Sequence, residues 1–175
     1  MDNKWPSVPQ IHTNFENAYS NPELIDQIMP ELHTLVDDHI ELCKLLQNLN
    51  GPMDLEQIAN VLQLVHAELK THFVAEEQVL FPLIANYLGG MDAGPVGIMM
   101  EEHRTIRALY TETINALEAT FREAEQLAGK LTNLNQALLD HLGKEDTGIF
   151  LVASHRLSDE EKAKVVEELP RYRDI

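Results

Sequence analysis

The chain has 175 residues, enough for one domain, and its hydrophobic content of 44% is typical of a globular protein. Its formal charge of −16 disfavours binding to nucleic-acid phosphates and to anionic membrane surfaces. The single cysteine, Cys43, excludes a disulfide within the chain, and no run approaches the ~18 apolar residues of a membrane span. The first residues lack the apolar segment of a signal peptide, so a cytoplasmic protein is expected.

The chain is almost continuously helix-forming from about residue 22 to residue 155, and strand patterns are absent. Residues 1–20 lack helical periodicity and are expected to form an extended arm. Glycine and proline breaks and helix-capping residues then separate the predicted helices. These signals are Asn50-Gly51-Pro52, Asp54, Gly89-Gly90, Pro95 and the two capping boxes Thr120–Glu123 and Ser158–Glu161.

The signals predict four long helices, which begin near Pro22, Asp54, Pro95 and Thr120, and a short terminal helix that Pro170 ends. Long helices with short connections predict an all-α protein, an antiparallel up-and-down four-helix bundle. The expected organisation is an N-terminal arm over residues 1–20, the bundle over 21–155, and a short C-terminal helix and tail over 156–175.

An internal repeat relates the two halves of the bundle. Residues 72–81 align with 141–150, and both segments carry a histidine, a glutamate at +4, an acid at +5 and a phenylalanine at +9. Residues 37–45 align with 101–109 around His39 and His103. The chain is therefore interpreted as two related helical hairpins.

The spacing of these residues indicates a metal site. Residues i and i+4 share one face of a helix, so His72 and Glu76 can reach the same ion, as can His141 and Glu145. The expected turns lie midway between the histidines of each hairpin, so all four histidines can lie at one level. Mixed nitrogen and oxygen ligands favour iron over calcium or magnesium. The predicted metal ligands are His39, His72, Glu76, His103, His141 and Glu145.

At these residues the chain resembles the hemerythrin-like, or HHE cation-binding, domain family. The motifs that carry the resemblance are His72-Phe-x-x-Glu76-Glu77-x-x-Leu80-Phe81-Pro82, Glu102-His103 and His141-x-x-x-Glu145. The resemblance implies a non-haem diiron centre, oxo- or hydroxo-bridged, with the four histidines as terminal ligands and the two glutamates as bridges. It also implies that dioxygen, nitric oxide or peroxide binds at open iron positions. Oxygen-carrying members have a fifth histidine one turn before the position of His103, where this chain has Met99.

Several functions remain open at this point. The first is a binding or sensing protein for dioxygen or nitric oxide, which is favoured over a dedicated enzyme. The second is a stress-response protein that donates iron or reduces peroxide or nitric oxide. The third is a structural bundle that binds zinc or no metal, and zinc or manganese could also replace iron. A homodimer is compatible with the sequence, and a ferritin-type oxidase is rejected because no histidine follows an acid by three residues.

The other residues of interest are expected to lie outside the set of metal ligands. Glu77 and Asp146 could orient ligand histidines. Cys43 and Tyr110 are expected mainly to pack in the core, and His33 and His66 to lie off the ligand face. His12 and His155 are expected to bind no metal.

Overall fold

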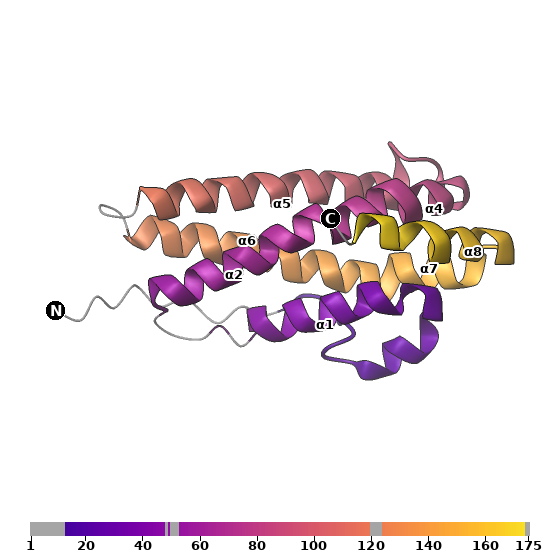
Figure 1. Cartoon of the computed structure of the whole chain (residues 1–175), viewed down its shortest axis with the longest axis horizontal. Helices are drawn as coiled ribbons and strands as arrows, with labels where there is room; N and C mark the ends of the chain where they lie inside the picture. Colours follow the sequence, from indigo (N-terminus) through magenta and orange to yellow (C-terminus); the bar gives the residue numbers. More distant parts are fainter. Residues whose placement is uncertain (1–12, 48, 50–52, 120–123, 174–175) are drawn as a thin grey trace.

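The structure, a computed structural model, describes residues 13–47, 49, 53–119 and 124–173. All regular elements in these ranges are helical, and no strand occurs among them. Four helical segments lie side by side along the long axis of the molecule (Figure 1), which confirms the predicted all-α bundle. None of the described helices is long and apolar enough to cross a membrane.

The first long helix begins later than predicted. α1 (His33–Gln47) is preceded by two short 3-10 turns, η1 (Pro22–Gln27) and η2 (Pro30–Leu32), and not by helix from Pro22 onwards. Between the turns, Ile28 and Met29 have ψ angles of 134° and 141°. Pro30 explains the interruption, because a proline pushes the preceding residue out of the helical region. The expectation of a helix from Pro22 was wrong for this reason.

The second long segment joins several elements. Asp54 begins it with a capping box, since its side chain accepts from Gln57 N at 2.8 Å and its own N–H donates to Gln57 Oε1 at 3.0 Å. Gly89 ends it with a φ of 93°, which a glycine adopts at little cost. The elements are α2 (Leu55–Lys70), α3 (His72–Ala75), η3 (Glu76–Leu80) and α4 (Phe81–Leu88).

The second hairpin repeats this arrangement. Its elements are α5 (Gly94–Glu118), α6 (Ala124–Lys144), η4 (Glu145–Ile149) and α7 (Phe150–Arg156). The turns predicted at Asn50–Pro52 and at Thr120–Glu123 lie outside the described residues.

A π-helical turn interrupts the second and fourth long helices at equivalent places. η3 begins at Glu76 and η4 begins at Glu145, the two glutamates of the His-x-x-x-Glu repeat. In each turn the N–H of the following phenylalanine bonds to the glutamate carbonyl five residues earlier. Such turns occur often at functional sites, and a hydrophobic period read over a few residues does not reveal them.

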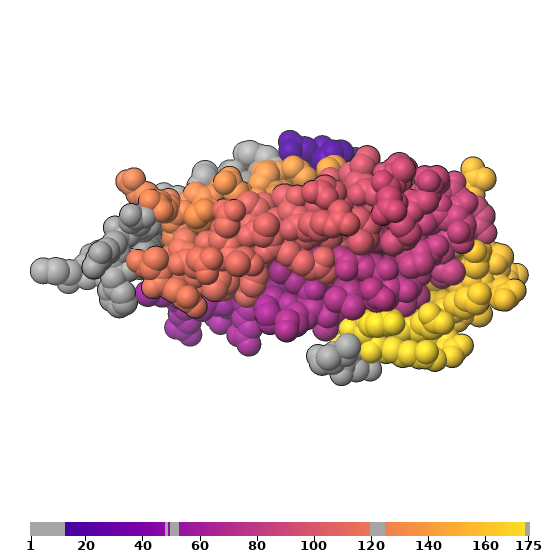
Figure 2. Space-filling view, turned by 90° about the horizontal axis from the view of Figure 1, so that it is seen from above, coloured from indigo at the N-terminus to yellow at the C-terminus, as the bar shows by residue number. Residues whose placement is uncertain are grey.

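The C-terminal segment folds back along the bundle. The predicted capping box at Ser158 begins α8 (Asp159–Glu168), and the 3-10 turn η5 (Leu169–Tyr172) contains Pro170. η5 contacts α3 and η3. Figure 2 shows this segment lying against the surface formed by the second long helical segment.

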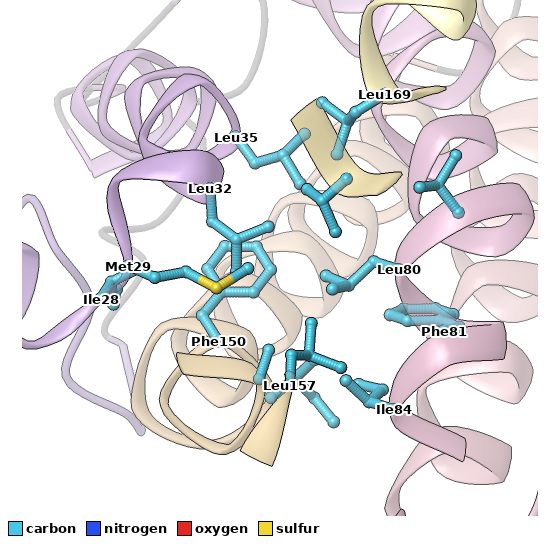
Figure 3. Packing of buried hydrophobic residues seen from close by; sticks show 14 of the residues in the cluster. Ile28, Met29, Leu32, Leu35, Leu80, Phe81, Ile84, Phe150, Leu157 and Leu169 are labelled. Carbon is cyan, nitrogen blue, oxygen red and sulfur yellow. The ribbon is translucent and has the colours of Figure 1, made fainter. Parts of the chain in front are cut away.

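The apolar core is divided into two clusters. One lies toward α4, α7 and α8, where Leu32, Leu80, Phe81 and Phe150 pack together (Figure 3). The other contains residues of α1, α2, α5 and α6 such as Leu42 and Leu138. Along α1 the boundary falls between Val36 and Leu42, at the level of His39.

The described part of the arm, residues 13–20, packs on α6 at Gly143. A Cβ atom at Gly143 would lie 2.6 Å from Phe15 Cβ and 2.9 Å from Glu16 O. Beside this contact, Asn14 Nδ2 donates to Asp140 Oδ2 at 3.0 Å. The close approach of arm to helix therefore requires a glycine.

Gly143→Ala is expected to destabilise the protein by about 1–3 kcal/mol, because the added methyl group overpacks the arm. Gly129→Ala is the matched control, since a Cβ at Gly129 of the same helix meets no atom within 4 Å. Helix propensity alone predicts that replacing glycine with alanine stabilises the folded protein by ~1 kcal/mol at either position. Urea denaturation at equal metal content measures the difference, and equal stabilisation by the two substitutions would contradict this packing.

Candidate metal centre

Six polar side chains meet inside the bundle, between the two apolar clusters. All six have no solvent exposure. They come from α1, α3, η3, α5, α6 and η4, so every long helical segment contributes. They are the six predicted metal ligands: His39, His72, Glu76, His103, His141 and Glu145.

The four histidines form two pairs. The Nε2 atoms of His39 and His72 are 3.0 Å apart, and so are those of His103 and His141. Metal–nitrogen bonds of about 2.0–2.1 Å would allow both nitrogens of a pair to bind one ion. Each pair therefore marks one candidate ion position.

The two glutamates connect the pairs. Glu76 places Oε1 3.3 Å from His72 Nε2 and Oε2 3.4 Å from His103 Nε2. Glu145 places Oε2 3.4 Å from His39 Nε2 and Oε1 3.2 Å from His141 Nε2. Each carboxylate thus faces both pairs, the arrangement required of a bridging ligand.

The glutamate oxygens are otherwise unsatisfied. None of the four carboxylate oxygens of Glu76 and Glu145 has a hydrogen-bond partner, although both side chains are fully buried. Burying a carboxylate without compensation is costly, and buried charges are normally paired or coordinate metals. The residues present therefore fit a pair of cations between the histidines.

Each histidine also contacts a carboxylate through its other ring nitrogen. An Nδ1–H donated to a carboxylate leaves Nε2 free to act as a ligand, and it fixes the orientation of the ring. The Nδ1 contacts are His39 with Asp146 at 2.7 Å, His72 with Asp38 at 3.0 Å, His103 with Glu77 at 2.7 Å and His141 with Glu102 at 3.0 Å. The orienting role considered for Glu77 and Asp146 agrees with these contacts.

Asp38 and Glu102 were not singled out from the sequence as partners of histidines. The signal was nevertheless present, because an acid directly precedes both His39 and His103 in the repeat. Each of these acids turns to the histidine of the neighbouring helix in its own hairpin, whereas Glu77 and Asp146 reach across to the other hairpin.

The carboxylates raise the proton affinity of the histidines. Burial opposes a charged His39, but the adjacent Asp146 carboxylate outweighs it and raises the pKa of His39 to about 10. Burial likewise opposes a charged His103, and Glu145, Glu76 and Glu77 raise its pKa to about 10. A metal ion would have to displace protons from these rings.

Aromatic rings enclose the histidines. Phe150 stacks on His39 with ring centroids 5.1 Å apart, and its repeat partner Phe81 lies 5.3 Å from His103. Phe73 also stacks on His103, with ring centroids 3.7 Å apart. These rings hold the imidazoles in place and keep water from the site.

The remaining residues named from the sequence are not among the six clustered side chains. His33 Nε2 lies 2.9 Å from Ile28 O, and the exposed His66 packs its ring 5.7 Å from Tyr110. Cys43 is buried in the second cluster, where burial raises the pKa of its thiol. Met99 is buried in the first cluster and His155 is exposed. His12 lies outside the described residues.

Comparison with known families places this site in context. The family described as the hemerythrin HHE cation binding domain matches residues 31–153, which contain all six clustered side chains. The chain belongs to the hemerythrin HHE cation-binding family. In this hemerythrin-family chain, the buried histidines and glutamates form two groups that could each hold a metal ion.

Curated relatives of this hemerythrin-family chain include two iron-sulfur cluster repair proteins YtfE. The protein from Cronobacter sakazakii is 30% identical over 99 residues, and the one from Escherichia coli O139:H28 is 26% identical over 99 residues. Each alignment covers 53% of this chain and 45% of the relative, so the chain spans about half the length of the relatives it matches. No solved structure gives a significant match.

Proposed function

We propose that this protein holds a carboxylate-bridged pair of non-haem iron ions and binds dioxygen or nitric oxide there. One observation carries the proposal. Two buried groups of two histidines and two glutamates share both glutamates, so the same carboxylates face both ion positions. The groups are His39, His72, Glu76 and Glu145, and Glu76, His103, His141 and Glu145.

The donor chemistry favours iron. Imidazole nitrogens with carboxylate oxygens suit iron, whereas a closed zinc site more often uses thiolates and histidines, and Cys43 is not part of the cluster. Iron supplies open coordination positions for a small ligand and one-electron redox chemistry. The side chains bind and orient the ions, and Phe73, Phe81 and Phe150 keep water away.

Two histidines at each position leave room for an external ligand. The histidine pairs and shared carboxylates supply a small ligand set for each ion, and Met99, a poor iron ligand, stands one turn before His103. A small diatomic molecule is the class of ligand that can enter a site this deeply buried.

The test is a titration with nitric oxide under anaerobic conditions, on protein loaded with ferrous iron and followed by optical absorption. A saturable spectral change at one or two molecules of nitric oxide per chain is expected. The same titration on Glu145→Ala protein should give a much smaller change. Loaded protein that shows no change with either nitric oxide or dioxygen would contradict the proposal.

Iron donation is the second candidate, and the printed function of the relatives favours it. Both are named iron-sulfur cluster repair proteins and are 26–30% identical to the aligned half of this chain. A site that serves as an iron source should release iron readily to an acceptor. Transfer of iron from the loaded chain to an apo iron-sulfur protein, faster than to buffer alone, would favour this role over ligand sensing.

A further inference from the structure

Four carboxylates contact the Nδ1 atoms of the histidines, and different parts of the chain hold them in place. These outer carboxylates are Asp38, Glu77, Glu102 and Asp146. At the His103–His141 pair, Arg107 Nη1 donates to Glu77 Oε1 at 2.6 Å, and Lys144 donates to Glu102. Both cations belong to α5 and α6, within the family-matched residues 31–153.

The His39–His72 pair depends instead on the two ends of the chain. The backbone N–H of Ala18, in the arm, donates to Asp146 Oδ2 at 2.7 Å. Arg173, just after η5, donates from both terminal nitrogens to Asp38, and Nη2 lies 2.9 Å from Oδ1. Ala18 and Arg173 both lie outside the family-matched residues.

The contact of Arg173 with Asp38 has the geometry of a specific pair. Two guanidinium nitrogens on two carboxylate oxygens form a fork that fixes direction as well as charge. The pair is mostly shielded from water, with side-chain exposures of 25% and 21%. Asp38 Oδ2 is also the oxygen that faces His72 Nδ1.

A second carboxylate competes for the same histidine. Glu68 Oε2 lies 3.5 Å from His72 Nδ1, whereas Asp38 Oδ2 lies at 3.0 Å. With Arg173 fixing Asp38 in place, the Nδ1–H of His72 points to Asp38. Without that fork the His72 ring can rotate so that its Nδ1–H faces Glu68, and this rotation also moves Nε2.

We propose that Arg173 is a positioning residue for His72, so that the C-terminal segment controls how firmly the His39–His72 half of the centre holds its ion. The inference rests on the proposed pair of ions. In this proposal Arg173 acts through Asp38, whose carboxylate it holds. In the opposite half, Glu77 and Glu102 pair with Arg107 and Lys144 of the bundle helices α5 and α6, so this half should lose its ion at the wild-type rate when Arg173 is replaced.

The test compares Arg173→Gln with Arg171→Gln. Arg171 lies in the same segment but is 61% exposed and pairs with the exposed Glu167, so the second variant controls for the lost charge. Protein loaded anaerobically with two ferrous ions per chain is mixed with excess ferrous chelator. In Arg173→Gln, half of the iron should leave about 3- to 10-fold faster and the other half at the wild-type rate. Arg171→Gln should release iron as the wild type does.

Two further variants separate positioning from general loosening. Arg173→Lys keeps the charge without the fork and should restore part of the slow release. Arg107→Gln should accelerate the release of the iron held by the His103–His141 half. A chain with both Arg173→Gln and Arg107→Gln should therefore release all of its iron fast. The metal-free Arg173→Gln protein should melt within about 2 °C of Arg171→Gln.

The outcomes that overturn the inference are distinct from a failure of the proposed function. Equal acceleration of both halves in Arg173→Gln, release identical to Arg171→Gln, or a double variant with one half still slow would overturn the role of Arg173. A wild-type chain that loads fewer than two ions would overturn the proposed function, and this inference with it.

Discussion

Replacing Glu76 or Glu145 with Ala should reduce the iron content from two ions per chain to one or none. Each carboxylate faces both histidine pairs, so one substitution removes an oxygen ligand from both ion positions. Loss of a group that only hydrogen-bonds to a metal ligand typically costs about 10–100-fold in metal affinity. Loss of a ligand shared by both ions should therefore cost at least ~100-fold. Iron content after reconstitution and desalting, measured by elemental analysis, gives the result.

The matched control for these variants is His155→Ala, because His155 is an exposed histidine of α7 away from the cluster. It should retain two ions. Glu76→Gln separates charge from shape, since the amide keeps the side-chain volume but is a poor bridge; it should resemble Glu76→Ala. Two tightly held ions in Glu76→Ala would mean that Glu76 is no bridge.

Removing the metal should lower the stability of the protein substantially, and most at alkaline pH. At free iron 100-fold above its dissociation constant, each ion contributes ~2.7 kcal/mol, so two ions contribute ~5 kcal/mol. For a chain of this length this corresponds to a Tm higher by about 10–20 °C. Melting with and without saturating ferrous iron, in the absence of oxygen, measures the difference.

The pH dependence follows from the raised pKa values of the histidines. The pKa values of His39 and His103 are about 10, above their ordinary value of 6.5, so the folded protein binds these protons more tightly than the unfolded chain. Their contribution to stability is complete below pH ~6.5 and is lost as the pH rises toward 10. Metal-free protein should therefore melt at a lower temperature at pH 9.5 than at pH 7.

Metal binding should show the opposite trend. Ions must displace the protons held by the histidines, so iron affinity should increase as the pH rises from 6 to 9. The gain in Tm from the metal should increase over the same range. A Tm unchanged by chelation, or metal-free stability that is constant from pH 7 to pH 10, would count against a buried site of this kind.

The six clustered residues could be predicted from the sequence because their geometry is local and repeated. His72 with Glu76, and His141 with Glu145, share helix faces at i and i+4, and the repeat places His39 and His103 on the partner helices. Antiparallel helices with turns midway between the histidines bring all four to one level. The structure brings these six side chains together in two groups that share both glutamates, and a third group of possible ligands, Asp38, Glu68 and His72, adjoins the first.

The features that the sequence did not reveal depend on contacts between distant residues. Arg173 pairs with Asp38, 135 residues earlier, and no spacing rule connects them. The stacking of Phe73 on His103 also needs two helices in their final positions. The π turns at Glu76 and Glu145 depend on a shift of backbone hydrogen bonds that side-chain patterns do not show.

The late start of α1 was predictable in principle. Pro30 disfavours a helical conformation at Met29, so a helix in this region is expected to begin only after Met29. The four-residue spacing of Leu24, Ile28 and Leu32 is also compatible with a helix; all three are buried, with Leu24 and Leu32 in the 3-10 turns and Ile28 between them. A continuous helix and a pair of 3-10 turns would both bury these residues, so their spacing does not distinguish the two structures.

The most direct test of the centre is the iron content of the intact chain, measured by elemental analysis after anaerobic reconstitution with ferrous iron and paired with an optical spectrum in air. Two ions per chain, with near-ultraviolet bands of oxygen-bridged iron after exposure to air, are the expected result. One zinc ion, or no bound metal after reconstitution, would contradict a pair of ions bridged by Glu76 and Glu145.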